Sequence, residues 1–165
     1  MKKHDVLLEF SRTLDVARVS KLGSVEKLKA DAGECAALAR RLKVPTILGL
    51  TAELHAKPWR GGGLKVTGHV TVDVEQISVV SLEQFRQTLR FQVERYFSNS
   101  LPQVVNDEEE IDPISNGFID LGEIVAETVG LELDLYPRKS GEEFGEMEIE
   151  AVKVPNPFAA LKIVK

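Results

Sequence analysis

Two long runs of alternating apolar residues, separated by three glycines, constrain the fold of this chain more than any other feature. Within residues 47–57 and 65–76 most even-numbered residues are apolar, which is typical of strands that bury one face. Gly61-Gly62-Gly63 supplies a turn between them. A hairpin centred on the middle glycine pairs Leu54 with Val70 and places the apolar residues of both strands on one side.

Further alternation predicts two more strands. One covers residues 85–97, and the other is indicated by Val6, Leu8 and Phe10 near the beginning of the chain. The segments 47–57, 65–76 and 85–97 then form an antiparallel meander. We therefore expect an α+β fold in which two amphipathic helices cover the apolar face of this sheet. The pattern leaves open whether the sheet curls toward a barrel.

Each predicted helix begins with an acidic capping residue. Asp31 has capping-box spacing to Glu34, and Asp120 has the same spacing to Glu123. Pro137 is expected to end the second helix. The apolar stripe of the first helix comprises Cys35, Leu38, Ala39 and Leu42, and that of the second comprises Leu121, Ile124, Val125, Thr128 and Leu131.

The remaining segments are more polar. Residues 98–117 include a run of five residues, Asn-Asp-Glu-Glu-Glu, and predict a mobile acidic loop within a single domain that spans residues 1–165. Residues 144–151 alternate glutamate with apolar residues, which indicates either an edge strand or an extended acidic tail. The stretch 157–161, which begins with proline, predicts a short helix.

Composition restricts the class of protein. A single cysteine, Cys35, rules out an intramolecular disulfide and favours a small buried core residue. The early apolar run ends at Glu9, too soon for a signal-peptide core, and no stretch approaches the ~20 apolar residues of a membrane span. We therefore expect a soluble cytoplasmic protein with no membrane partner.

Charge is distributed unevenly along the chain. Residues 1–70 carry a net charge of +6, whereas residues 71–165 carry −11, and the whole chain carries −5. The total argues against nucleic-acid binding by the whole surface. The asymmetry allows a basic face for a polyanion and an acidic face for a basic partner. Alternatively, acidic and basic side chains from the two parts of the sequence are intermixed on the surface of the folded chain.

No motif indicates catalysis, a metal or a cofactor. Ser78-Val79-Val80-Ser81 lacks a nucleophile elbow, and the triple glycine lacks the lysine and hydroxyl residue of a phosphate-binding loop. His55 and His69 face each other in the predicted hairpin register, but zinc requires three or four ligands. The sequence therefore predicts neither an enzyme, nor a metal or cofactor site, nor a small-molecule substrate.

One face of the predicted hairpin combines an aromatic ring with cations. The odd-numbered positions carry Lys57, Trp59 and Lys65, and Arg60 lies at the tip. An aromatic ring among cations can stack on an unpaired base while the cations contact phosphates. These four residues are candidates for RNA contact. The alternative is that Trp59 packs into the core, as most tryptophans do.

The chain resembles the YceD-like family, described as large ribosomal RNA subunit accumulation protein. The resemblance is strongest over Ile119-Asp120-Leu121-Gly122-Glu123 and over Tyr136-Pro137-Arg138-Lys139-Ser140-Gly141. Phe10-Ser11-Arg12, Val74-Glu75-Gln76 and Pro157-Phe158-Ala159 match in the same order. One departure concerns Ser78 and Ser81, which occupy positions where many family members have cysteines, so thiolate metal binding is absent there.

The resemblance implies a role in synthesis, processing or stability of large-subunit ribosomal RNA, without enzymatic activity. We therefore expect a factor that binds this RNA, its precursor or an assembling ribosomal particle. A second hypothesis is an acidic adaptor that holds a basic ribosomal protein without contacting RNA, and a third is an RNA-processing enzyme. Arg138 and Lys139 are further candidates for phosphate contact, or else belong to the architecture around the second helix.

Overall fold

The computed structural model describes residues 8–100 and 110–142. A five-stranded sheet has the order β2-β3-β4-β5-β6, and β1 pairs with β7 in a separate ribbon. The five strands are β2 (Ser24–Lys29), β3 (Thr46–Trp59), β4 (Gly63–Ile77), β5 (Gln84–Ser98) and β6 (Ile111–Pro113). The other elements are β1 (Thr13–Asp15), a 3-10 turn η1 (Val16–Arg18), α1 (Ala32–Leu42), β7 (Phe118–Asp120) and α2 (Leu121–Glu132).

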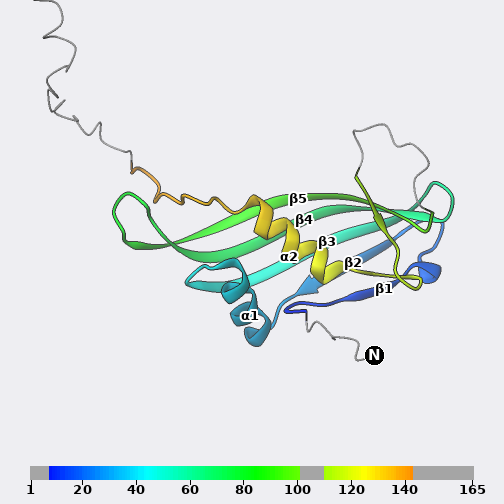
Figure 1. Ribbon diagram of the computed structural model, residues 1–165, viewed down its shortest axis with the longest axis horizontal. Helices are drawn as coiled ribbons and strands as arrows, with labels where there is room; N and C mark the ends of the chain where they lie inside the picture. Colours follow the sequence, from blue (N-terminus) through cyan, green and yellow to red (C-terminus); the bar gives the residue numbers. More distant parts are fainter. Residues whose placement is uncertain (1–7, 101–109, 143–165) are drawn as a thin grey trace, which may run out of the picture.

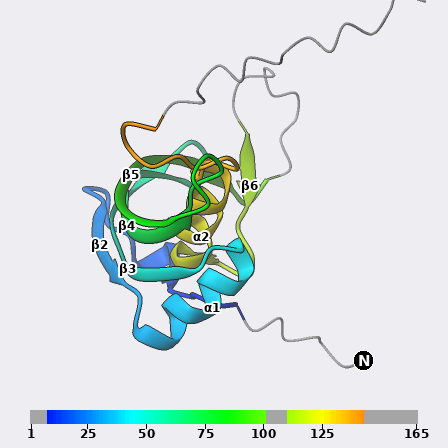
Figure 2. The same cartoon turned by 90° about the vertical axis from the view of Figure 1, so that its left-hand side faces the viewer.

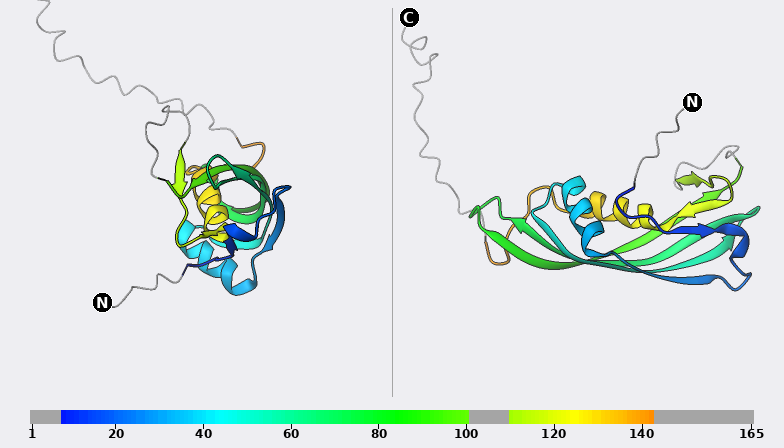
Figure 3. Two further views of the ribbon diagram at one scale, coloured as in Figure 1. Left: turned by 90° about the vertical axis from the view of Figure 1, so that its right-hand side faces the viewer. Right: turned by 90° about the horizontal axis from the view of Figure 1, so that it is seen from below.

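The expected α+β architecture is confirmed. All strand pairs in the large sheet are antiparallel except β5 with β6, which is parallel. The sheet curls, and both helices lie on its concave side, with α2 along the middle (Figures 1 and 2). The view from below in Figure 3 shows how far β3, β4 and β5 extend beyond the helices. Because β2 and β6 do not pair with each other, the sheet does not close into a barrel.

The core lies between the concave face of the sheet and the two helices. The strands contribute alternating residues such as Leu54, Val66 and Val72, whose side chains are fully buried. The helices contribute most of the predicted stripes, including Leu38 and Val125. The prediction of Leu131 in the second stripe is wrong: it lies in the last turn of α2 and is 81% exposed, whereas Val129 is buried. Burial of these apolar side chains, at roughly 25 cal/mol per Å², is the main force holding the helices on the sheet.

The hairpin register differs from the prediction by two residues. Trp59 pairs with Gly63, so Leu54 lies opposite Gly68 and not opposite Val70. A shift of two residues leaves every side chain on its predicted face, because side chains in a strand alternate with period two. The shift does separate the histidines: His55 lies opposite Thr67, and His69 lies opposite Glu53.

Turn geometry explains this register. Gly61 and Gly62 both have positive φ, +60° and +83°, a conformation that glycine adopts without steric cost. The turn is closed by the Gly63 amide, which donates to the Arg60 carbonyl oxygen at 3.1 Å. The third glycine therefore begins β4, and the turn is centred one residue earlier than predicted.

A bulge near the beginning of β3 corrects a second expectation. The register with β4 shifts between Ile47 and Gly49. A bulge inserts one residue, so side chains before it change faces. Ile47 is consequently buried, whereas Leu48, which was predicted to face the core, is 45% exposed.

The helices begin where the sequence predicts. Asp31 and Glu34 form a full capping box at the N-terminus of α1, and Asp120 accepts a hydrogen bond from the Glu123 amide at the N-terminus of α2. The predicted end of α2, at Pro137, is wrong. The helix ends at Glu132, five residues before Pro137.

Other predictions changed or fall outside the described residues. Phe10 is buried but lies in a bend, and Val6 lies outside the described residues. Residues 111–113 form β6, so this part of the predicted 98–117 loop is a strand. The predictions for 144–151 and 157–161 also lie outside the described residues.

Candidate nucleic-acid interface

The end of the β3–β4 hairpin brings the predicted aromatic and basic residues together. The Trp59 ring lies against the Tyr96 ring, with centroids 4.9 Å apart and planes inclined at 54°. The Arg60 guanidinium lies 5.2 Å from the Trp59 ring centroid, and Lys65 Nζ lies 5.2 Å from that of Tyr96. We call Lys57, Trp59, Arg60, Lys65 and Tyr96 the hairpin-end cluster.

Strand register assembles this cluster. Lys57 pairs with Lys65 on β4, and Lys65 pairs with Tyr96 on β5, so the three side chains share the convex face of the sheet. Trp59 lies on the same face and is half-buried beside Tyr96, outside the hydrophobic core. The alternative that Trp59 packs into the core is therefore wrong.

Sequence reasoning missed Tyr96 and its neighbour Glu94. The Tyr96 hydroxyl donates a hydrogen bond to Glu94 Oε1 at 2.6 Å, and Lys65 Nζ lies 3.7 Å from the same oxygen. The pKa of Lys65 is raised, first by its interaction with Tyr96 and then by the charge of Glu94. The pKa of Glu94 is lowered, chiefly by the Tyr96 hydroxyl. Lys65 is therefore held as a cation beside the ring.

The cluster has the components of a single-stranded nucleic-acid site. Two partly exposed aromatic rings lie on the convex face, with Arg60 and Lys65 against them and Lys57 opposite Lys65 on β3. Stacking of a base on an aromatic side chain contributes about 1–3 kcal/mol and tolerates any base. Cations beside the rings can neutralise phosphates, and Glu94 offsets only part of that charge.

Arg138 and Lys139 do not join this cluster. They follow α2 at the opposite end of the sheet, beside the β4–β5 turn (Figure 1). Lys139 Nζ lies 3.6 Å from Glu83 Oε2, and the Pro137 carbonyl oxygen accepts a hydrogen bond from the Val79 amide at 3.0 Å. The length of β4, about 46 Å at ~3.3 Å per residue, separates them from the hairpin end.

The β4–β5 turn also contains the two serines at the family's cysteine positions. Ser78 is fully buried, and its hydroxyl donates to Glu142 while accepting from the Val80 and Ser81 amides. The pKa of Glu142 is lowered, chiefly by the Ser78 hydroxyl. These hydrogen bonds fix the segment after α2 on the turn, so the Ser78 hydroxyl has a structural role.

Asp120 of the family motif joins the Ser11-Arg12 segment to the N-terminus of α2. Its carboxylate accepts hydrogen bonds from the Ser11 hydroxyl at 2.5 Å, the Arg12 amide at 2.9 Å and the Glu123 amide at 3.2 Å. Arg12 in turn forms a bidentate pair with Glu34 of α1, at 2.8 and 3.0 Å. The residues Phe10-Ser11-Arg12 and Asp120, which match the family far apart in sequence, therefore form one structural unit.

The other motif residues have structural roles as well. Leu121 is buried, and Glu123 forms a bidentate pair with Arg41, which joins α2 to α1. Gly122 packs directly on the backbone of the Phe10 segment, where an added Cβ would lie 2.5 Å from the Phe10 carbonyl oxygen. The exposed Tyr136 and the hydrogen-bonded Pro137 lie beyond α2. Apart from the exposed Tyr136, the motif residues thus have structural roles.

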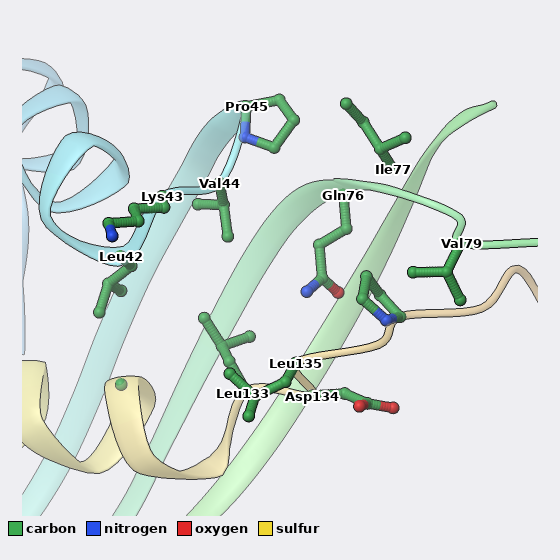
Figure 4. A pocket seen from close by; sticks show the side chains of 12 residues that line it. Leu42, Lys43, Val44, Pro45, Gln76, Ile77, Val79, Leu133, Asp134 and Leu135 are labelled. Carbon is green, nitrogen blue, oxygen red and sulfur yellow. The ribbon is translucent and has the colours of Figure 1, made fainter. Parts of the chain in front are cut away.

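A pocket of about 370 Å³ lies at the end of the sheet that holds the β4–β5 turn (Figure 4). Its walls are mainly apolar side chains such as Leu42, Ile77 and Leu133, with Gln76 and Asp134 among its few polar groups. A second pocket, of about 430 Å³, contains Arg95 held by Asp112 and Glu127. The first pocket is thus mainly apolar, whereas the second is lined by several charged and hydroxyl side chains.

Two further findings concern other kinds of site. Within residues 8–100 and 110–142, the structure contains no group of three histidine, cysteine or carboxylate side chains arranged to hold a metal ion. The two α-helices of the same part of the chain are too short and polar to cross a membrane.

Comparison with known proteins identifies a family that the chain matches. No curated protein and no solved structure matches the chain. A family model described as large ribosomal RNA subunit accumulation protein YceD matches residues 66–165, which include most of β4, all of β5, the Asp120 motif and the segment after α2. Since this match covers more than half of the chain, the protein belongs to the YceD family.

Proposed function

We propose that this protein supports accumulation of large-subunit ribosomal RNA by binding single-stranded stretches of that RNA or its precursor, without catalysing a reaction. The family description supports the role in ribosomal RNA accumulation. The hairpin-end cluster supports direct RNA contact, because it places two surface aromatic rings among three cations. This arrangement is the single observation that carries the proposal.

The proposal concerns unpaired RNA for a physical reason. Bases in a duplex are already stacked on one another, so their faces are not accessible to Trp59 or Tyr96. Loops, bulges and strand ends offer free base faces, and precursor RNA contains such regions before it is fully folded. A protein that covers them would protect the RNA or delay incorrect pairing.

The adaptor hypothesis has less support within the described residues. The carboxylates that could hold a basic protein are mostly engaged in the fold. Asp112 and Glu127 pair with Arg95, Glu123 pairs with Arg41, and Asp120 binds three donors. A basic partner would have to break these interactions before forming its own.

Fluorescence of Trp59 tests the proposal directly, because the chain contains one tryptophan. Titration with a single-stranded oligoribonucleotide is expected to quench its emission saturably, since a stacked base changes the environment of the ring. A duplex of the same sequence is expected to quench it much less. Equal quenching by both, or none by either, would contradict binding of unpaired RNA at the hairpin end.

A further inference from the structure

One edge of β5 has no neighbouring strand over most of its length. Of the described strands, only β4 and β6 pair with β5, and β6 reaches only its last three residues, Tyr96, Phe97 and Ser98. The stretch Gln84–Arg95 therefore presents its outward amide and carbonyl groups on the side away from β4. We call this side the β5 edge.

Long regular edges are uncommon because they pair readily with other chains. The usual protections are a short strand, a proline, a bulge, charged side chains along the edge, or a helix or loop that covers it. Of these, β5 carries charged side chains, including Arg86 and Arg90. β5 has fifteen residues, contains no proline and pairs with β4 without a register shift. Leu89 and Phe91, whose side chains point toward the concave face, are only partly buried. Over Gln84–Arg95 the edge thus lacks a backbone partner among the described strands, while Leu89 and Phe91 pack against the core with part of their surface still exposed.

The two faces of β5 beside this edge differ in chemistry. Arg86 and Arg90 lie on the convex face. Arg86 pairs with Asp73 of β4, whereas Arg90 forms no ion pair within the described residues. Leu89 and Phe91 lie on the concave face. A strand that fits here therefore alternates acidic residues, placed beside the arginines, with apolar residues, placed beside Leu89 and Phe91.

The chain itself contains such a segment. Residues 146–151 read Glu-Met-Glu-Ile-Glu-Ala, in which three glutamates alternate with three apolar residues. We propose that residues 146–151 pair in parallel with the β5 edge as an additional strand. The glutamates would then lie beside Arg86 and Arg90, and the apolar residues would extend the concave face.

The position where the described chain ends favours this occupant. Glu142 binds the Ser78 hydroxyl, and the Ser78 amide donates to the Glu83 carbonyl oxygen, one residue before β5 begins. Four residues span at most ~14 Å, enough to bring residue 146 beside the first residues of β5. The connection from β5 to this segment includes α2 and is long enough for the crossover that parallel strands need, which is usually helical.

Disulfide trapping tests the proposal in the full chain. Thr88 is exposed on the convex face of β5, and Thr88→Cys is combined in turn with a cysteine at each of residues 146–151. Neighbouring strands lie ~4.8 Å apart, within reach of a disulfide when both side chains share a face. Thr88→Cys alone is the control for disulfide formation with the native Cys35, which is buried in the core.

We expect intrachain disulfides at positions 146, 148 or 150 in several-fold higher yield than at positions 147, 149 and 151. This alternation distinguishes a paired strand from random encounters near the β5 edge. Equal yields at all six positions, or no intrachain disulfide at any, would overturn the proposal. Disulfide-linked dimers in place of intrachain disulfides would show that a second copy of the chain pairs with the β5 edge, and would also overturn the proposal. None of these outcomes depends on RNA binding at the hairpin end.

Discussion

Replacing Gly122 with alanine is expected to lower the free energy of unfolding by about 2 kcal/mol or more. The added Cβ would lie 2.5 Å from the Phe10 carbonyl oxygen and 2.9 Å from the Arg12 amide nitrogen. Both contacts are backbone atoms, and the Arg12 backbone is also held by Asp120. The clash therefore outweighs the ~1 kcal/mol that alanine gains over glycine within a helix. Thermal or denaturant unfolding measures the difference.

Gly130→Ala is the matched control, because Gly130 lies in the same helix. Its added Cβ would approach only Leu42 Cδ2, at 3.1 Å, and this atom is the far end of a flexible side chain. We expect Gly130→Ala to leave stability unchanged or to raise it by up to ~1 kcal/mol. If Gly122→Ala proved as stable as Gly130→Ala, the contact between α2 and the Phe10 segment would not determine stability as described.

The double substitution Lys57→Glu with Lys65→Glu is expected to abolish most RNA binding. The two lysines face each other across β3 and β4, and Lys65 lies beside Tyr96. Reversing both charges removes two phosphate contacts and adds repulsion to the remaining ones. The slope of log affinity against log salt is also expected to fall by about 1.4, since each contact with single-stranded RNA contributes ~0.7. Titrations at several salt concentrations measure both effects.

Lys43→Glu with Lys139→Glu changes the net charge by the same amount at the opposite end of the sheet. Lys43 lines the apolar pocket there, and Lys139 pairs with Glu83. We expect this variant to bind RNA with an affinity close to that of the unmodified protein. Equal losses in both double variants would show that binding responds to total charge and not to the hairpin-end cluster.

The parts of the fold that the sequence predicts correctly are those determined by local pattern. The capping box of Asp31 and Glu34 and the apolar stripe that follows depend on residues within one helix. Alternation likewise determines which face of β3 and β4 is buried. Alternation does not determine the register of β3 against β4. Three consecutive glycines permit more than one turn, and registers that differ by two residues place the same side chains on each face.

The missed elements depend on contacts between distant segments. The sequence of β2 shows little apolar alternation, and Val25, Lys27 and Lys29 are exposed. It forms a strand because β3 offers it an edge. β1 and β7, three residues each, are similarly stabilised by pairing with each other and by Asp120.

In the candidate site, too, the residues close together in sequence could be predicted and those brought in by strand pairing could not. Lys57, Trp59 and Lys65 could be grouped from the hairpin alone, because they lie close together in sequence. Tyr96 joins them only through the pairing of β4 with β5, which the meander predicts but does not place residue by residue. For Arg138 and Lys139 the sequence leaves open phosphate contact or a place in the architecture around α2. The packing of the segment after α2, where Lys139 pairs with Glu83, places that segment far from the hairpin end.

Ultraviolet crosslinking in cells, with sequencing of the attached RNA and identification of the crosslinked peptide, tests the central claim most directly. We expect reads concentrated in unpaired stretches of the large-subunit precursor, and a crosslinked peptide that contains Trp59 or Tyr96. Absence of crosslinked RNA, in cells whose large-subunit ribosomal RNA still depends on the protein, would contradict direct binding. Crosslinks confined to peptides distant from the hairpin end would contradict the proposed site.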